Sequence, residues 1–321
     1  MADLRHPKSK VRVSERHYPC EVSRFLEAHG IPNVLWGELV MNAFLVPVVP
    51  NGVYFIIPDE HIDKARDLLV EDGLPPCQLG KYCGFDWLNS IHGIPYAHFN
   101  IIDLGPLRSY NSEEYGPNPR RWYTLELYKK SEMLWGAPEI PLGPPPLNDP
   151  DYWTINDERL PEVNRAFSIG RLVDANYPVK IPSPARYTEM LTLLYFRDNF
   201  PEETFRGSHW RYLLLDMLTV LEKHHLFELR DLPPRTRSWI KIRLKPWGKK
   251  HEDVEDRLGE EMRKSGEVPE KSPWPSAHTM PPGWREELEQ WEEEEEQRKK
   301  KKEEEEQMRK KEEEVKQEQN V

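Results

Sequence analysis

Residues 30–73 read GIPNVLWGELVMNAFLVPVVPNGVYFIIPDEHIDKARDLLVEDG, and this stretch decides the fold that the sequence predicts. Two apolar runs, Asn33–Trp36 and Val53–Ile57, have the length and the β-branched or aromatic content of buried strands. Glu38–Leu45 and Asp59–Gly73 repeat apolar residues at helical spacing, the second with an N-cap residue at its start and a glycine stop. The stretch therefore predicts a strand, a helix, a second strand and a second helix.

Further elements are expected on both sides of this stretch. Period-two alternation or short β-rich runs predict strands, and apolar residues at helical spacing predict helices. The expected strands are Tyr96–Leu104, Trp122–Tyr128 and Val179–Ile181; the expected helices are Glu21–His29, Pro184–Asn199 and His209–Phe227. Together the elements predict an α/β (α+β) fold with a small mixed sheet, flanking helices and a helical half.

The composition divides the 321 residues into a folded body and polar ends. An aromatic content of 11% is typical of a folded core, whereas 31% charged residues and a net charge of −11 indicate a long polar segment. We expect five parts along the chain. They are a mobile basic arm at 1–17, a sheet half at 18–150, a mainly helical half at 151–250, a linker at 251–284 and a charged low-complexity tail at 285–321, disordered or a single helix.

The location is predicted from features that the sequence lacks. Cys20, Cys77 and Cys83 form no C-x-x-C pair, so a disulfide framework or a metal site is not expected. The sequence contains neither an apolar run of about 18 residues nor the apolar core of a secretory signal. We therefore expect a soluble intracellular protein, cytoplasmic or nuclear, with no membrane partner.

A basic segment near the C-terminal side of the body has two interpretations. Between Asp231 and Glu252 there are seven Lys or Arg residues and no acid, and apolar residues alternate with basic ones over Ile240–Lys245 as in a half-buried strand. The segment is either an anion-binding ribbon or an edge strand whose charges prevent sheet-to-sheet association. The anion-binding candidates are Arg235, Arg237, Lys241, Arg243 and Lys245.

Four segments, taken together, resemble a known family. It is a large, mostly uncharacterised family of fungal proteins whose fold is similar to that of the nucleotidyltransferases, including the toxins of abortive-infection systems. The resemblance covers roughly Cys20–Asp231. The segments that carry it are VLWGELVMNAFLVP (34–47), VYFIIPDEHIDKARDLLVEDGLPPC (53–77), LELYKKSEMLW (125–135) and VKIPSPARYTEMLTLLYFRD (179–198).

The resemblance implies where a nucleotide site would lie. In active members of the wider superfamily, a Gly-Ser or Gly-Gly pair ends the first strand. Two Asp residues on the second strand, one residue apart, share a face and bind Mg²⁺ beside a nucleoside triphosphate. Gly37 matches the glycine, but Glu38 stands where a small residue would contact phosphate. Gly52 and Tyr54 fall at the two metal positions, and neither binds Mg²⁺ through its side chain.

The function predicted from this pattern is binding rather than catalysis. Asp103 or Glu126 is a candidate for the remnant of a third metal ligand, the favoured alternative being an ordinary strand residue, and one acid does not hold two metal ions. We expect a catalytically silent nucleotidyltransferase-like protein with no cofactor. Two alternatives remain open: an active transferase that uses Mg²⁺ with displaced carboxylates, and an interaction protein that uses the basic segment and the charged tail. The partner would be a nucleotide, a protein or a nucleic acid.

Overall fold

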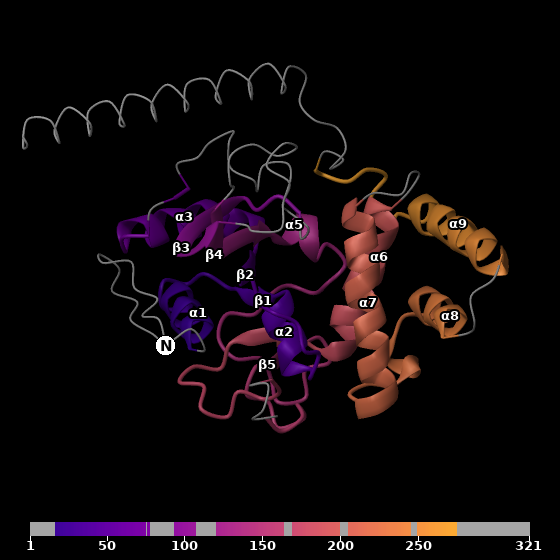
Figure 1. Cartoon of the computed structure of the whole chain (residues 1–321), viewed down its shortest axis with the longest axis horizontal. Helices are drawn as coiled ribbons and strands as arrows, with labels where there is room; N and C mark the ends of the chain where they lie inside the picture. The colour runs from indigo at the N-terminus through magenta and orange to yellow at the C-terminus, as the bar shows by residue number, and fades with distance from the viewer. Residues whose placement is uncertain are drawn as a thin grey trace, which may run out of the picture. The chain divides into compact units, whose positions relative to one another are not determined.

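The computed structural model describes residues 17–74, 76–77, 93–106, 120–163, 169–199, 205–244 and 249–274 (Figure 1). At 102–106, 120–122, 205, 220–221 and 249–253 only the backbone is described. The predicted arm, apart from His17, and the predicted tail at 285–321 lie outside the described residues, as do Cys83 and Lys245.

A four-stranded mixed sheet forms the first part of the body. Its strands are β1 (Val34–Trp36), β2 (Gly52–Ile57), β3 (Ala97–Pro106) and β4 (Arg120–Lys129), in the spatial order β1-β2-β4-β3. β2 pairs antiparallel with β1 and parallel with β4. All six residues of β2 are buried because the strand is central in the sheet, which explains its continuous apolar run. The predicted mixed sheet is confirmed.

Short helices follow the strands closely. They are α1 (Tyr18–Ala28), α2 (Glu38–Ala43), the 3₁₀ turn η1 (Asp59–His61), α3 (Ile62–Glu71) and α5 (Lys130–Met133). Gly37 has a φ of 79° between β1 and α2, a conformation that favours glycine and permits the abrupt change of direction.

The expected helix cap at Asp59 is wrong. α3 begins at Ile62, and the Asp59 carboxylate instead accepts hydrogen bonds from the Ser131 backbone N–H (3.0 Å) and from Ser131 Oγ (2.5 Å). Ser131 is 72 residues from Asp59 in the sequence, so no local sequence pattern predicts this contact.

The second part of the body is mainly helical. β5 (Tyr152–Thr154) and β6 (Lys180–Pro182) form a two-stranded antiparallel sheet, and β6 also contacts β1. Two long helices follow, α6 (Pro184–Asp198) and α7 (Phe205–His224), and they pack along one another (Figure 1). Ser183 caps α6 by accepting a hydrogen bond from the Arg186 backbone N–H. The predicted packing of these two helices is confirmed.

Two further helices lie where the sequence predicted a strand and a linker. After the 3₁₀ turn η3 (Leu229–Asp231), α8 (Pro234–Arg243) occupies most of the predicted basic strand, which is therefore wrong, and α9 (Lys249–Lys264) begins just before the predicted linker at 251–284 and occupies its first part. Thr236, Trp239 and Ile240 are the buried residues of α8, a spacing of three and four that is helical. Pro234 is compatible with the first turn of a helix, because that position needs no backbone N–H donor.

A buried polar contact joins α8 to α9. Trp239 Nε1 donates to Glu255 Oε1 (2.9 Å), and the Arg243 guanidinium forms an ion pair with the same carboxylate. Glu255 is buried although its surroundings in the sequence are highly charged. α9 is therefore part of the folded body.

Trp274 is the last residue of the chain that the structure describes. Its indole lies directly on Gly93, so closely that a Cβ atom placed there would be 2.5 Å from Cη2. The guanidinium carbon of Arg197 on α6 lies 4.5 Å from the ring centroid, and that of Arg206 on α7 lies 5.1 Å from it.

Among the residues that the structure describes, no helix combines the length and apolar character needed to span a bilayer.

A pH dependence follows from His98 on β3. Burial lowers the pKa of His98 to about 4, so the folded protein keeps the ring neutral while the unfolded chain protonates it below about pH 6.5. The unfolded state binds more protons between these values, so stability falls as pH falls through the window. We expect a loss of about 2–3 kcal/mol between pH 6.5 and pH 4 from this residue.

Urea titrations at several pH values measure the effect. The His98→Asn variant should lose this part of the pH dependence, whereas His224→Asn, at an exposed histidine of α7, should keep it. An unchanged slope in His98→Asn would show that other groups carry the pH dependence.

Candidate functional site

The phenol ring of Tyr54 fills the space where the resemblance places a nucleotide site. Tyr54 is buried on β2, and its ring lies so close to Gly37 that a Cβ atom added to Gly37 would be 2.4 Å from Tyr54 Cδ2. A Cβ atom added to Gly52 would lie 2.5 Å from Thr124 Oγ1 and 2.7 Å from the Thr124 carbonyl oxygen. Position 52 therefore has no room for a carboxylate without a backbone shift.

Glu126 is the acid that the sheet brings to this point. The parallel register of β2 and β4 pairs Tyr54 with Glu126. The carboxylate is buried, and its two oxygens accept hydrogen bonds from Thr124 Oγ1 (2.6 Å) and from Tyr128 Oη (2.5 Å). Thr124, Glu126 and Tyr128 are alternate residues of one strand, so their side chains share a face.

Charge and burial keep the tyrosines of this cluster protonated. Burial raises the pKa of Tyr54 well above its usual range, and the charges of Glu38 and Glu126 raise it further. Burial, followed by the charge of Glu126 and the hydrogen bond to it, does the same for the pKa of Tyr128. Burial and the charge of Glu38 raise the pKa of Tyr187, whose Oη donates to the Gly37 carbonyl (3.4 Å). At neutral pH all three phenols are protonated, as the hydrogen bonds donated by Tyr128 and Tyr187 require.

The donor set does not fit a pair of Mg²⁺ ions. Such ions require several oxygen ligands, chiefly carboxylates and waters, in near-octahedral geometry. The two positions implied by the resemblance hold Gly52 and a protonated Tyr54, and both oxygens of Glu126 already accept hydrogen bonds. Among the described residues, no group of three or more His, Cys, Asp or Glu side chains has an arrangement suited to a metal ion.

The structure brings together most of the residues predicted for the vestigial site. Gly37, Glu38, Gly52, Tyr54 and Glu126 lie in one cluster at the start of α2 and the middle of the sheet. Asp103 is on β3, and its side chain lies outside the described part of the structure.

The sequence analysis did not assign a role to the donors around Glu126. Thr124 and Tyr128 stand two residues on either side of it, so the predicted alternation of β4 already placed all three side chains on one face. Tyr187 on α6 has no comparable signal, because it reaches the cluster only through the packing of α6 against the sheet.

The predicted anion-binding residues do not form a basic ribbon. Arg235 forms an ion pair with Glu267, Arg237 donates to the carbonyl oxygens of Arg230 and Leu232 (both 2.8 Å), and Arg243 pairs with Glu255. Lys241 is exposed on α8. Among the described residues of this set, Arg235, Arg237 and Arg243 therefore bind groups of their own chain.

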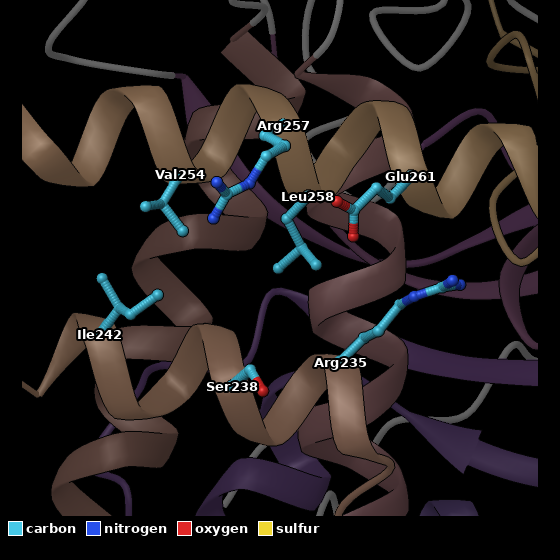
Figure 2. A pocket seen from close by; sticks show the side chains of 7 residues that line it. All are labelled: Arg235, Ser238, Ile242, Val254, Arg257, Leu258 and Glu261. Atoms are coloured by element: carbon cyan, nitrogen blue, oxygen red, sulfur yellow. The ribbon is translucent and has the colours of Figure 1, made fainter.

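A small cleft of about 320 Å³ lies between α8 and α9. Figure 2 shows Leu258 of α9 pointing towards Ser238 of α8, with Ile242 and Val254 facing one another beside them. The volume is at the low end of the range of small-molecule sites, and the lining is mixed. The lining residues are Arg235, Ser238, Ile242, Val254, Arg257, Leu258 and Glu261.

The close packing around Gly52 leads to a prediction. Gly52→Ala places a methyl group against the Thr124 backbone, which cannot rotate away, so we expect a loss of about 1–3 kcal/mol in the free energy of unfolding. Gly136→Ala is the matched control, because its nearest neighbour is the end of the Leu193 side chain at 3.3 Å. Urea denaturation compares them, and equal stability of the two variants would contradict the packing described here.

The chain was compared with known proteins. No protein-family model and no curated protein matches it. Among solved structures, it is similar to the crystal structure of an antigenic nucleotidyltransferase-like protein from Paracoccidioides brasiliensis. The two are 12% identical with a TM-score of 0.36, and the match covers 76% of this chain and 91% of that chain.

Proposed function

We propose that this chain is a catalytically silent nucleotidyltransferase-like protein that acts through binding. The observation that carries the proposal is the buried ring of Tyr54, which lies on Gly37 and pairs in register with Glu126. The resemblance requires a metal-binding carboxylate at that position and an open approach for phosphate beside Gly37. A protonated phenol supplies neither the charge nor the space.

Glu38 adds an electrostatic argument. It is buried at the first position of α2, where an active member of the superfamily would bring its backbone to a phosphate group. Without a metal ion, two carboxylates close to one ring repel a triphosphate, and the low dielectric of a buried site strengthens the repulsion. A silent centre therefore agrees with both the shape and the charge of the cluster.

The rival function is a transferase that uses displaced carboxylates. It is favoured by one observation, the presence of Glu38 and Glu126 near the same tyrosine ring. It predicts transfer of label from radioactive nucleoside triphosphates to protein or RNA in the presence of Mg²⁺ or Mn²⁺.

A labelling assay with all four nucleoside triphosphates decides between the two. We expect no labelling, and no heat of nucleotide binding in calorimetry. Labelling that is lost in Glu126→Gln and retained in Glu139→Gln, at an exposed acid outside the cluster, would overturn the proposal. Glu126→Gln preserves the shape of the side chain, so a loss of labelling would report on the charge rather than on packing.

The kind of partner is inferred from the surface rather than from the cluster. Arg235, Arg237 and Arg243 are engaged within their own chain, so a protein is a better candidate than a nucleic acid.

A cytoplasmic or nuclear location goes with this proposal, because Cys20 and Cys77 form no disulfide in the structure. Immunofluorescence of the tagged protein tests the location.

A further inference from the structure

A proline-rich segment links α5 to β5. Residues 138–150 read PEIPLGPPPLNDP, with six prolines, and we name them the proline strap. No helix or strand is assigned within the strap. The proline content of the strap, rather than the backbone hydrogen bonds of a helix or sheet, restricts its conformation.

Three consecutive prolines determine the local backbone. Each pyrrolidine ring holds φ near −65°, and a residue that precedes proline is restricted to extended or polyproline II conformations. Pro144 and Pro145 meet both conditions, so the chain there favours a polyproline II turn of three residues. Pro144 and Leu147 are three residues apart and share one face of such a turn.

The strap is anchored at four places to the body. Ile140 is buried in the core, and the Nζ atom of buried Lys180 donates to the Gly143 carbonyl (3.0 Å). At the ends, Tyr152 Oη donates to the Pro138 carbonyl and Ser183 Oγ to the Pro150 carbonyl, each at 2.7 Å. The strap is therefore held in one shape before any partner arrives, which lowers the entropic penalty of binding.

Between these anchors the strap exposes its apolar side chains. Leu142 is 58% exposed and Leu147 is 82% exposed, and Pro144 and Pro146 are exposed as well. A single exposed leucine is ordinary on a protein surface. In the strap, four apolar residues within six positions are exposed, and the prolines restrict the backbone that carries them. The strap therefore has the features of a peptide ligand on the protein surface.

The acids around the strap are engaged within the chain. Glu139 forms an ion pair with Lys130 (3.2 Å), Asp151 forms one with Arg186, and Asp149 Oδ1 accepts hydrogen bonds from the backbone N–H groups of Asp151 and Tyr152 (both 2.8 Å). Recognition of the strap therefore depends on its exposed apolar side chains rather than on net charge.

We propose that the proline strap binds a protein domain with an aromatic-lined groove that recognises a polyproline II segment. Such grooves recognise polyproline II segments in SH3, WW and EVH1 domains, because the ligand is already ordered. A second copy of this chain is a poor occupant: among the exposed large apolar side chains of the described residues, Tyr212 is the one aromatic. The inference is independent of the silent cluster, so either can fail alone.

Binding of the full-length protein to purified SH3, WW and EVH1 domains, measured by biolayer interferometry, tests the proposal. We expect binding by at least one of these classes of domain, weakened at least about ten-fold in Pro144→Ala/Pro146→Ala and in Leu147→Asp. Val173→Asp, at an apolar residue 60% exposed outside the strap, is the matched control and should bind as the unmodified protein does.

Three results would overturn the proposal: binding by none of the domains, equal binding by the strap variants and the control, or self-association that the strap variants abolish. Circular dichroism confirms folding first, because the substituted side chains are exposed and should leave the body intact.

Discussion

Asp198→Ala is expected to lower the free energy of unfolding by about 3–5 kcal/mol, as removal of one member of a buried ion pair does. Arg197 Nε and Nη2 donate to the two Asp198 oxygens at 2.7 and 2.9 Å, and both side chains are 1% exposed. Trp210 Nε1 also donates to Asp198, at 2.8 Å. The variant leaves a guanidinium buried without its counter-ion and an indole N–H without its acceptor.

Urea denaturation measures this loss, with Asp67→Ala as the control. Asp67 also pairs with a neighbouring arginine at 2.8 Å, but its side chain is 60% exposed, so its removal should change stability by about 0–1 kcal/mol. A similar small change for Asp198→Ala would mean that water reaches the pair.

Tyr54→Ala is the second large effect, with an expected loss of about 3–5 kcal/mol in the free energy of unfolding. The ring packs on Gly37, lies near Gly52 and contacts Tyr128 edge-on with centroids 6.3 Å apart, so its removal leaves a cavity in the middle of the sheet. The cavity also lies beside buried Glu126, the cross-strand partner of Tyr54.

Tyr212→Ala is the matched control, since Tyr212 on α7 is 68% exposed and should change stability little. Thermal or urea denaturation compares the two variants. If Tyr54→Ala and Tyr212→Ala had equal stability, the ring of Tyr54 would not be the packed element described above. Adding Mg²⁺ and nucleoside triphosphate should not restore the stability of Tyr54→Ala, because neither of the two implied metal positions, 52 and 54, carries a carboxylate in the variant.

The sheet and the helix pair were predictable because their signals are local. β2 is a short buried run between turn residues, and α6 begins at a serine cap followed by proline. Such patterns need no knowledge of distant parts of the chain.

The region of α8 and α9 was not predictable in this way. Ile240 belongs to two patterns: the alternation with Ile242 and Leu244 that favours a strand, and the spacing with Thr236 and Trp239 that the structure uses. The choice depends on Glu255, which pairs with Arg243 from a segment whose composition is that of a linker. The contact between α8 and α9, rather than a local sequence pattern, therefore determines that both segments are helical.

The candidate site was predicted in part. The resemblance indicated Gly37, Gly52 and Tyr54 as neighbours, and the structure places the Tyr54 ring against both glycines. The pairing of Tyr54 with Glu126 depends on the register of two parallel strands that are far apart in sequence, which no local pattern gives.

The position of Trp274 has a consequence for the order in which the protein is made. A ribosome releases the chain from its N-terminus, at about 5–20 residues per second. Arg197, Arg206 and the surface of Gly93 therefore emerge well before the indole that covers them. A nascent chain interrupted between α8 and Trp274 has its sheet and its long helices but an open face over two arginines. The indole can cover this face only after residue 274 has left the ribosome.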